Sequence, residues 1–358
     1  PDALDPIQFT AAEGQGEYAS FFRAVLEEEY PVRSLLNGVY NKVAWDFPWL
    51  LPDGTGASAD ADTYTDQFLE WSAERDGPWA ACVNFMDAHA PYEPSDEHDN
   101  WGGNQLRSVQ NKVEKPVWSF HGGDEPWWQA RALDALYDGC IRQVDAEIAR
   151  IVSMLRERGE FENTLLVVTS DHGEGFGEPS RLKRDTRVVG HVEGIHERLL
   201  HVPLVVKRPE SNGGVRIQKP ATLTRFPDVV QSELNGGDTN FVPDGPVIAS
   251  SHGLTEPNMR LAREYCGDDE LWRFRGTMRA VYNHEDGVEK SATWEDTNAS
   301  VTCINASTSY LSGRGDDVRT RVDSVFNELN DVDVRESFDL DDVDSDVERR
   351  LQDLGYAD

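Results

Sequence analysis

Lysine is scarce in this sequence. Seven of its 34 basic residues are lysines, and its 66 acidic residues leave a formal net charge of -32. This charge argues against a nucleic-acid or anionic-membrane partner, because the attraction to phosphate would be reversed in sign. An acidic, lysine-poor surface indicates adaptation to concentrated salt, which screens the self-repulsion of the fold; an ordinary acidic enzyme is the alternative. We therefore expect a halophilic protein that loses stability in dilute buffer.

Cysteines and long apolar runs are also few. The four cysteines form no Cys-x-x-Cys pair, which excludes a zinc ribbon or a disulfide scaffold, and Cys82 and Cys140 lie in apolar patterns typical of core thiols. No window approaches the roughly 18 apolar residues of a membrane span, and no signal peptide is visible. We expect a location in the cytoplasm of a high-salt cell. The Asn-x-Ser triplets at Asn298 and Asn305 leave export open, and the oligomeric state cannot be read.

The length of 358 residues suits one large domain and a smaller one. Hydrophobic periodicity predicts helices over residues 19–29, 62–75, 133–155 and 194–200. Apolar runs predict buried strands over residues 79–86, 164–169 and 202–206. The alternation of strands and helices predicts an α/β fold with a mostly parallel sheet.

The pattern changes to short strands and turns in the last third of the chain. Strands are expected over residues 245–251 and 277–282, an acidic solvated tail over 331–346, and a final helix over 347–354. We therefore divide the chain into a domain over residues 1–225 and a small C-terminal α+β subdomain over residues 226–358.

Candidate chemistry gathers where the expected strands end. Asp171 and His172 follow one strand directly, and Asp87 and His89 follow another. Ligands of parallel α/β sheets bind beyond the carboxyl ends of the strands. An Asp oxygen and a His nitrogen there can share a divalent ion, with Gly173 allowing a sharp turn. An Asp-His pair in that place can equally be a simple capping or turn feature.

Several separated motifs resemble the sulfatase family of the alkaline-phosphatase superfamily. They are residues 85–92 (FMDAHAPY), 137–145, 167–174 (VVTSDHGE), 190–206 with its VPL signature, and 350–356 (RLQDLGY). The resemblance implies an alkaline-phosphatase-like α/β/α sandwich. Its first strand is missing here, because the element that carries the paired Asp ligands does not occur in this sequence.

The resemblance also implies roles for individual residues. Asp171 and His172 map onto the later pair of metal ligands, and the cofactor is a divalent metal whose identity, Ca, Mn, Zn or Mg, stays open. His89 and His191 are implied to be catalytic and to bind substrate, although His89 can also be a structural histidine beside a turn. Val192 stands where many members carry a lysine that binds the transferred group. We therefore expect that this binding function has passed to His191 or is lost.

Two neighbouring groups of charges are harder to assign. We expect Glu174 and Glu178 to be solvated loop charges rather than partners of the metal. Residues 179–189 carry the one basic cluster of the chain, Arg181, Lys183, Arg184 and Arg187. This cluster could attract an anionic ester or be unrelated to function.

The nucleophile of the family does not occur in this sequence. None of the four cysteines begins a Cys-x-Pro-x-Arg element, and no Ser-x-Pro-x-Arg occurs. We therefore expect an N-terminally truncated chain that is inactive alone. The leading hypothesis is an arylsulfatase-type sulfuric ester hydrolase acting on a small anionic ester. The alternatives are a phosphodiesterase, phosphonate monoester hydrolase or phosphotransferase of the same superfamily, and a non-catalytic binding module.

Overall fold

The computed structural model describes residues 60–330 with the exception of residues 184, 193, 212, 285, 286 and 306. The described residues fall into two compact units, residues 60–90 and residues 91–330. The expected helix over residues 19–29, the acidic tail, the final helix and the motif over residues 350–356 lie outside the described residues.

The unit of residues 60–90 is built around one helix. Helix α4 (Ala61–Ala73) confirms the periodicity, since Phe68 and Trp71 lie on one face and both rings approach Trp79, at centroid distances of 5.7 and 6.2 Å. The Asp87 carboxylate accepts a hydrogen bond of 3.1 Å from the backbone nitrogen of Ala61, at the start of the helix. This contact satisfies one of the amides that a helix N-terminus leaves without an internal partner.

The buried strand expected over residues 79–86 is wrong for the described structure. The segment is irregular, and the Cys82 thiol, which we expected in the core, is exposed. A strand that is buried on both faces needs a hydrogen-bonded neighbour along its edge. The described residues provide no such neighbour for this segment.

Helices dominate the first half of the unit of residues 91–330. They are α5 (Gly103–Gln110), α6 (Pro116–Gly122) and the 30-residue α7 (Trp128–Glu157). Helix α7 confirms the longest periodic pattern, and its buried face includes Leu133, Leu136 and Cys140. These side chains share a core with Tyr92, Phe120, Phe176 and Val189. The core thus joins α7 to the segment that contains Phe176 and Val189.

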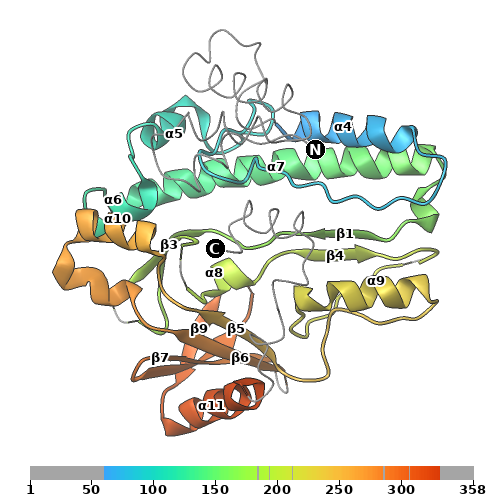
Figure 1. The fold of residues 1–358 in the computed structure, drawn as a ribbon. Coiled ribbons are helices and arrows are strands. Elements are labelled where there is room, and N and C mark those ends of the chain that lie inside the picture. Colours follow the sequence, from blue (N-terminus) through green and yellow to red (C-terminus); the bar gives the residue numbers. More distant parts are fainter. Residues whose placement is uncertain are drawn as a thin grey trace, which may run out of the picture. The chain divides into compact units, whose positions relative to one another are not determined.

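Four short strands and one helical turn follow α7. They are β1 (Leu166–Thr169), β2 (Gly175–Pro179), β3 (Arg187–Gly190), α8 (Glu197–Leu200) and β4 (Leu204–Lys207). Strands β1 and β4 confirm two of the expected strands. The chain is therefore a mixed α/β protein, as the alternation of elements predicted (Figure 1).

The parallel pairing that the sequence predicted is wrong for these strands. Strands β1 and β4 pair antiparallel, with Leu166 opposite Lys207, and β2 and β3 form an antiparallel hairpin. A parallel crossover needs a connection of about a dozen residues, usually a helix, that carries the chain back along the sheet. The connection between β1 and β4 instead contains the hairpin and α8, whose four residues rise only about 6 Å.

A five-stranded antiparallel sheet occupies the C-terminal part of the described chain. Its strands, in spatial order, are β5 (Val247–Ser251), β6 (Met278–His284), β7 (Val288–Trp294), β8 (Thr297–Cys303) and β9 (Ser309–Gly313). Strands β5 and β6 confirm the two strands expected in this region. Where the boundary between the predicted domains 1–225 and 226–358 falls stays a prediction.

The two faces of this sheet pack against different partners. Val281 packs against helix α11 (Asp316–Asn330), which Figure 1 shows alongside β6 and β7. The adjacent residue Ala280 points to the opposite face, where Leu182 and Ile195 close a second core. Side chains alternate across a strand, which explains how one strand serves both cores.

Four further elements follow β4. They are the 3₁₀ helices η3 (Leu223–Arg225) and η4 (Asp268–Phe274) and the α-helices α9 (Phe226–Leu234) and α10 (Glu256–Cys266); a third 3₁₀ helix, η2 (Phe161–Asn163), precedes β1. The first two along the chain, η3 and α9, come before β5, and the other two, α10 and η4, lie between β5 and β6. None of the described helices has the length and apolar character that a membrane crossing requires.

Candidate functional site

Asp171 and His172 lie in the turn that leaves β1. Both side chains are open to solvent: 77% of the Asp171 side chain and 41% of the His172 side chain are exposed. The backbone nitrogen of His172 donates to Asp171 Oδ1 at 2.9 Å, and His172 Nδ1 lies 2.9 Å from the Gly173 carbonyl oxygen. These contacts hold both side chains against the backbone of the turn.

The two side chains converge on the same side of this turn. Asp171 Oδ2 lies 3.6 Å from His172 Nε2. With its proton on Nδ1, His172 donates to Gly173 and keeps a lone pair on Nε2, which is the usual state of a metal-binding histidine. Two ligand atoms at about 2.0–2.2 Å from one cation lie roughly 3–4 Å apart. The pair can therefore supply one oxygen and one nitrogen to a divalent metal.

Gly173 has a different role from the sharp turn that the sequence suggested. Its backbone is not in the left-handed region, and a Cβ atom there would lie 2.0 Å from the carbonyl oxygen of Arg198 in α8. Its backbone nitrogen also donates to the Leu199 carbonyl oxygen at 2.9 Å. Glycine is thus needed because the turn that carries Asp171 and His172 packs directly on the backbone of α8.

His191 lies against this turn, although 19 residues separate it from His172. The two imidazole rings stack with their centroids 3.9 Å apart and their planes 25° apart. Gly190 precedes His191 with φ at +64°, and a Cβ on it would meet Val117 at 2.5 Å, so glycine is required there on both grounds. The β2–β3 hairpin therefore brings His191 back to the Asp171–His172 pair.

Glu174 is the main correction to the expected site. Instead of being solvated, its side chain is only 8% exposed, and its Oε2 lies 2.9 Å from His191 Nδ1. This hydrogen bond is the largest influence on the pKa of His191, which is raised even though burial acts to lower it. A buried carboxylate on Nδ1 orients the ring and leaves Nε2 for another partner. One feature of the sequence could have indicated that Glu174 belongs to the site: it lies two residues after His172, a candidate metal ligand.

Tyr92 contacts the same carboxylate. Burial first, and then the charge of Glu174 and a hydrogen bond to it, raise the pKa of the Tyr92 phenol well above its usual value. The Tyr137 ring packs edge-on against Tyr92 at 5.4 Å, and burial followed by Glu174 raises its pKa to about 12. Both phenols therefore stay neutral and can donate hydrogen bonds near Glu174.

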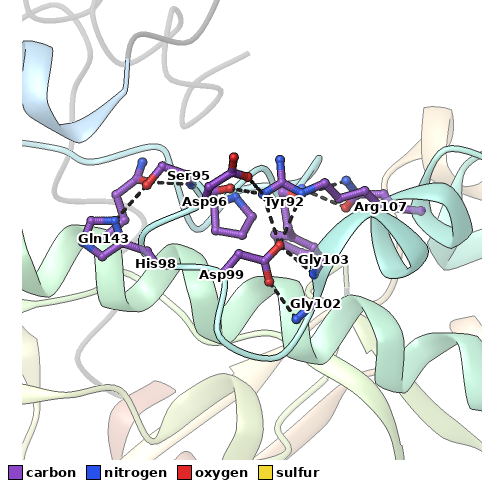
Figure 2. A network of polar contacts seen from close by, with 11 residues as sticks. Tyr92, Ser95, Asp96, His98, Asp99, Gly102, Gly103, Arg107 and Gln143 are labelled. Carbon is purple, nitrogen blue, oxygen red and sulfur yellow. Dashed lines mark hydrogen bonds and ion pairs between the residues drawn. The ribbon is translucent and has the colours of Figure 1, made fainter.

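A polar network fixes the segment that carries Tyr92. The side-chain amide of Gln110 exchanges two hydrogen bonds with the Tyr92 backbone, at 2.8 and 3.0 Å. Figure 2 shows the neighbouring contacts, in which Arg107 pairs with Asp99 at 3.1 Å and Gln143 of α7 accepts from the Ser95 backbone at 2.9 Å. The loop between residues 91 and 102 is thus tied to α5 and α7, and its position sets that of Tyr92.

His89 belongs to the unit of residues 60–90. Its backbone nitrogen donates to the Met86 carbonyl oxygen at 2.9 Å, and its Nδ1 lies 2.7 Å from the Ala90 carbonyl oxygen. The residue is exposed, so the ring is accessible. The structure therefore brings three expected site residues together, Asp171, His172 and His191. The position of His89 relative to them stays a prediction.

The other charges near the hairpin have structural partners. Glu178, which was expected to be solvated, is buried; its carboxylate accepts from the Phe176 backbone at 2.8 Å and pairs with Arg198 at 3.0 Å. Lys183 is also buried and donates to the Arg273 carbonyl oxygen. Two residues of the basic cluster thus contact later parts of the chain: Lys183 contacts η4, and Arg181 contacts β9 through a hydrogen bond to the Ser309 carbonyl oxygen.

A model of the family described as "Sulfatase" matches residues 7–231, which is more than half of the chain. The chain belongs to the sulfatase family. The motifs around Asp87, Asp171 and the VPL strand all lie inside the matched region, so the resemblance drawn from them is confirmed. Members of this family are hydrolases of the alkaline-phosphatase superfamily and generally use a divalent metal.

Curated relatives match shorter parts of this sulfatase. It is 29% identical over 120 residues to a multifunctional alkaline phosphatase superfamily protein of Trinickia caryophylli, covering 33% of this chain and 21% of the relative. It is 28% identical over 191 residues to an ulvan-active sulfatase of Formosa agariphila, covering 52% of this chain and 32% of the relative. The chain thus spans less than half of the length of these relatives.

Among solved structures, a phosphonate monoester hydrolase of Agrobacterium radiobacter matches with a TM-score of 0.45 and 18% identity. The match covers 67% of this chain and 53% of that one.

The donor set of this sulfatase fits part of a divalent-metal site. Asp171 and His172 present two ligand atoms at a suitable spacing, and the second nitrogen of His172 is held by a backbone carbonyl. No group of three or more His, Cys, Asp or Glu side chains with metal-binding geometry occurs among the described residues. The described part of the chain therefore offers two candidate metal ligands.

Proposed function

We propose that this protein is a metal-dependent sulfuric ester hydrolase of the arylsulfatase type, which acts on a small anionic ester. The observation that carries the proposal is the convergence of Asp171 Oδ2 and His172 Nε2, 3.6 Å apart, beside the stacked ring of His191. Family membership makes a hydrolase the expected activity, and this arrangement offers a place for its metal and for the transferred group.

Asp171 and His172 are the proposed metal ligands. A bound divalent cation there would neutralise negative charge that develops on the sulfuryl oxygens. Both side chains are exposed, so a metal and an ester can reach them without a change in the core. The mixed oxygen and nitrogen donors are compatible with Mn, Zn, Mg or Ca, so the metal identity stays open.

His191 is proposed to bind the transferred group through Nε2. Its Nδ1 is turned to Glu174, and the stacked His172 ring keeps its plane next to the metal ligands. Glu174 acts through His191 and is a positioning residue, because its carboxylate is buried away from solvent. Tyr92 extends this chain of contacts through its hydrogen bond to Glu174.

His89 is proposed to contact the ester or leaving-group oxygen, as a donor or general acid. Support for this role is the accessible ring of His89 and its place in the family-like segment 85–92. No residue named here is proposed as the nucleophile, since no cysteine of the sequence carries the Cys-x-Pro-x-Arg element.

A phosphonate monoester hydrolase or phosphodiesterase is the second candidate function. The observation that favours it is His172 itself, because an imidazole ligand makes the site richer in nitrogen than an amide oxygen would. The name of the Trinickia relative, a multifunctional superfamily protein, is consistent with this chemistry.

The test is an assay of the complete protein in concentrated salt, with an aryl sulfate, an aryl phosphonate monoester and an aryl phosphodiester of the same leaving group. We expect the sulfate to give the highest kcat/KM. The second candidate replaces the first if either phosphorus ester is preferred. Asp171→Asn should lower kcat/KM by on the order of 100-fold and lower bound metal measured by elemental analysis.

Asp244→Asn is the matched control, because Asp244 is exposed and lies in a loop before β5. It should leave both activity and metal content unchanged. Full activity and full metal content in the Asp171→Asn variant would contradict the proposed metal site. Failure of the complete protein to hydrolyse any of the three esters would favour the third hypothesis, a non-catalytic binding module.

We also propose that the protein works in concentrated salt, inside the cell. The support is the net charge of -32 and the low lysine content. The expected result is a fall in thermal unfolding temperature as sodium chloride is diluted. A temperature that is independent of salt would favour an ordinary acidic enzyme.

A further inference from the structure

A cavity of about 50 Å³ lies between the residues around the β2–β3 hairpin and strands β6–β8 of the C-terminal sheet. Five basic side chains line it: Arg181, Lys183, Arg187, Arg273 and Lys290. Among the described lining residues, Glu197 is the single carboxylate. We call this space the basic cavity. Its charge is unusual in a protein whose net charge is -32.

The one carboxylate of the basic cavity is already neutralised. Glu197 Oε1 lies 2.5 Å from Lys290 Nζ, and both side chains are buried. Arg273 Nε pairs with Glu270 at 3.2 Å, outside the lining, and Arg181 and Arg187 are the lining arginines without a carboxylate partner among the described residues. Like charges enclosed together in a low-dielectric space repel each other and favour a bound anion.

Arg181 provides the clearest unmet donor of the basic cavity. Its terminal nitrogen donates to the Ser309 carbonyl oxygen at 2.8 Å, but its buried Nε has no hydrogen-bond partner among the described residues. A buried charged donor without an acceptor is costly, and native proteins rarely leave one. An oxyanion in the basic cavity would supply the acceptor.

The pKa of His121 is also affected by the positive charges around the basic cavity. Its ring lines the basic cavity, and its pKa is lowered to about 4 by burial and then by the charges of Arg273 and Lys183. At neutral pH the ring is therefore uncharged and can donate one hydrogen bond. The opposite wall is apolar, with Met278, Ala292 and others from the sheet, so a bound anion would interact strongly with the donors.

The size of the basic cavity matches a small tetrahedral ion. Each water needs about 10–15 Å³ of such space, so the basic cavity accommodates roughly four waters or the four oxygens of one such ion. We propose that the basic cavity binds a tetrahedral oxyanion, sulfate or phosphate, held by Arg181 and Arg273. Asp171, His172 and His191 do not line it, so the inference does not depend on the proposed hydrolase function.

The direct test uses crystals of the complete protein, grown without sulfate or phosphate and soaked in selenate, a tetrahedral ion that scatters X-rays anomalously. We expect an anomalous peak inside the basic cavity, within hydrogen-bond distance of Arg181 and Arg273. Ordered water or chloride in its place, or selenate on the outer surface alone, would overturn the proposal.

Calorimetric titration at constant high sodium chloride tests the same site in solution. Sulfate or phosphate should bind, and Arg181→Gln should weaken the binding by about tenfold because one charge-assisted donor is lost. Arg260→Gln is the matched control, since Arg260 is an exposed arginine of α10. Equal binding in the Arg181→Gln and unmodified proteins, or no binding to the unmodified protein, would contradict the assignment.

Separate titrations with sulfate and phosphate show which ion is preferred, and either preference supports the site. Thermal unfolding of each variant shows whether it is folded. The selenate experiment needs no variant, so it decides the question even if Arg181→Gln fails to fold.

Discussion

The Asp171–His172 turn and the Glu197–Lys290 pair each bring two polar side chains close together, but they differ in how far these side chains are exposed to solvent. The turn exposes its two side chains to solvent, whereas the side chains of Glu197 and Lys290 are 3% and 5% exposed. Exposed side chains are accessible to a metal or a substrate. The buried Glu197 and Lys290 side chains bind each other and are closed to solvent. The comparison teaches that the first pair is suited to function and the second to holding the fold together.

Removing one partner of the buried pair is expected to have the largest effect. Lys290→Met leaves the Glu197 charge buried and should lower the free energy of unfolding by about 3–5 kcal/mol, measured by urea titration in concentrated salt. The double variant Glu197→Gln with Lys290→Met should recover most of this loss. A single variant that unfolds with the same midpoint as the unmodified protein would remove the distinction between the two pairs.

His172→Ala should affect function rather than stability. We expect kcat/KM to fall by on the order of 100-fold, because one of the two proposed metal ligands is lost. The free energy of unfolding of the metal-free protein should change by less than about 0.5 kcal/mol, as for other exposed positions. His201→Ala, at an exposed histidine after α8, is the control and should change neither quantity.

The comparison extends to two histidines whose pKa values move in opposite directions. Glu174 raises the pKa of His191, whereas burial and then Arg273 and Lys183 lower that of His121 to about 4. Between pH 6.5 and 4 the unfolded chain protonates this histidine and the folded chain does not, so stability falls as pH falls. The expected loss is about 3 kcal/mol across this window.

His121→Gln tests this assignment, because glutamine cannot titrate. Its unfolding free energy, measured at several pH values and constant salt, should depend less on pH between 6.5 and 4. Glu197 contributes at lower pH: burial raises its pKa, but Lys290 outweighs this and the net pKa is lowered. Its stabilising effect is therefore lost only as the pH falls below about 4.3. An unchanged slope in His121→Gln would show that the ring is not buried as described.

Glu174→Gln probes how the exposed turn is supported from within. The substitution keeps the shape of the side chain but removes its charge, so kcat should fall by about tenfold while the metal remains bound. A shift in the imidazole nitrogen signals of His191 by NMR should accompany the loss. Glu289→Gln, at a carboxylate that accepts from Ser300 and Thr302 in the C-terminal sheet, should leave the His191 signals in place.

An exposed ion pair gives the smallest expected effect. Arg263 Nε lies 2.9 Å from Asp268 Oδ1, and both side chains are largely exposed. Arg263→Gln should lower the free energy of unfolding by about 0.5 kcal/mol or less, because water and salt screen the pair. A loss as large as that of Lys290→Met would show that burial is not what separates the pairs.

Local patterns in the sequence predicted the helices and several strands well. The period near 3.6 residues predicted α4 and α7, the apolar runs predicted β1 and β4, and the pattern of short strands and turns predicted β5 and β6. These signals lie within the element itself, so no knowledge of its partners is needed. The adjacent Asp171 and His172 could be singled out for the same reason, since both follow one strand directly.

Features that depend on distant partners were missed. The antiparallel orientation of β1 and β4 depends on how the 34 residues between them fold. The burial of Glu174 depends on Tyr92 and His191, which lie far from it in the sequence. The exposure of Cys82 depends on which segments cover residues 79–86, and an apolar run carries no record of that.

The sequence by itself determined the family, the mixed α/β class and the residues available for chemistry, because motifs and periodicity are properties of neighbouring positions. Tertiary structure alone decided which of these residues meet. It stacked His191 on His172, buried Glu174 against His191, and placed Arg181, Lys183 and Arg187 around the basic cavity beside the C-terminal sheet. The physical reason is that hydrogen bonds and electrostatic interactions depend on distance and burial in space, which separation along the chain does not specify.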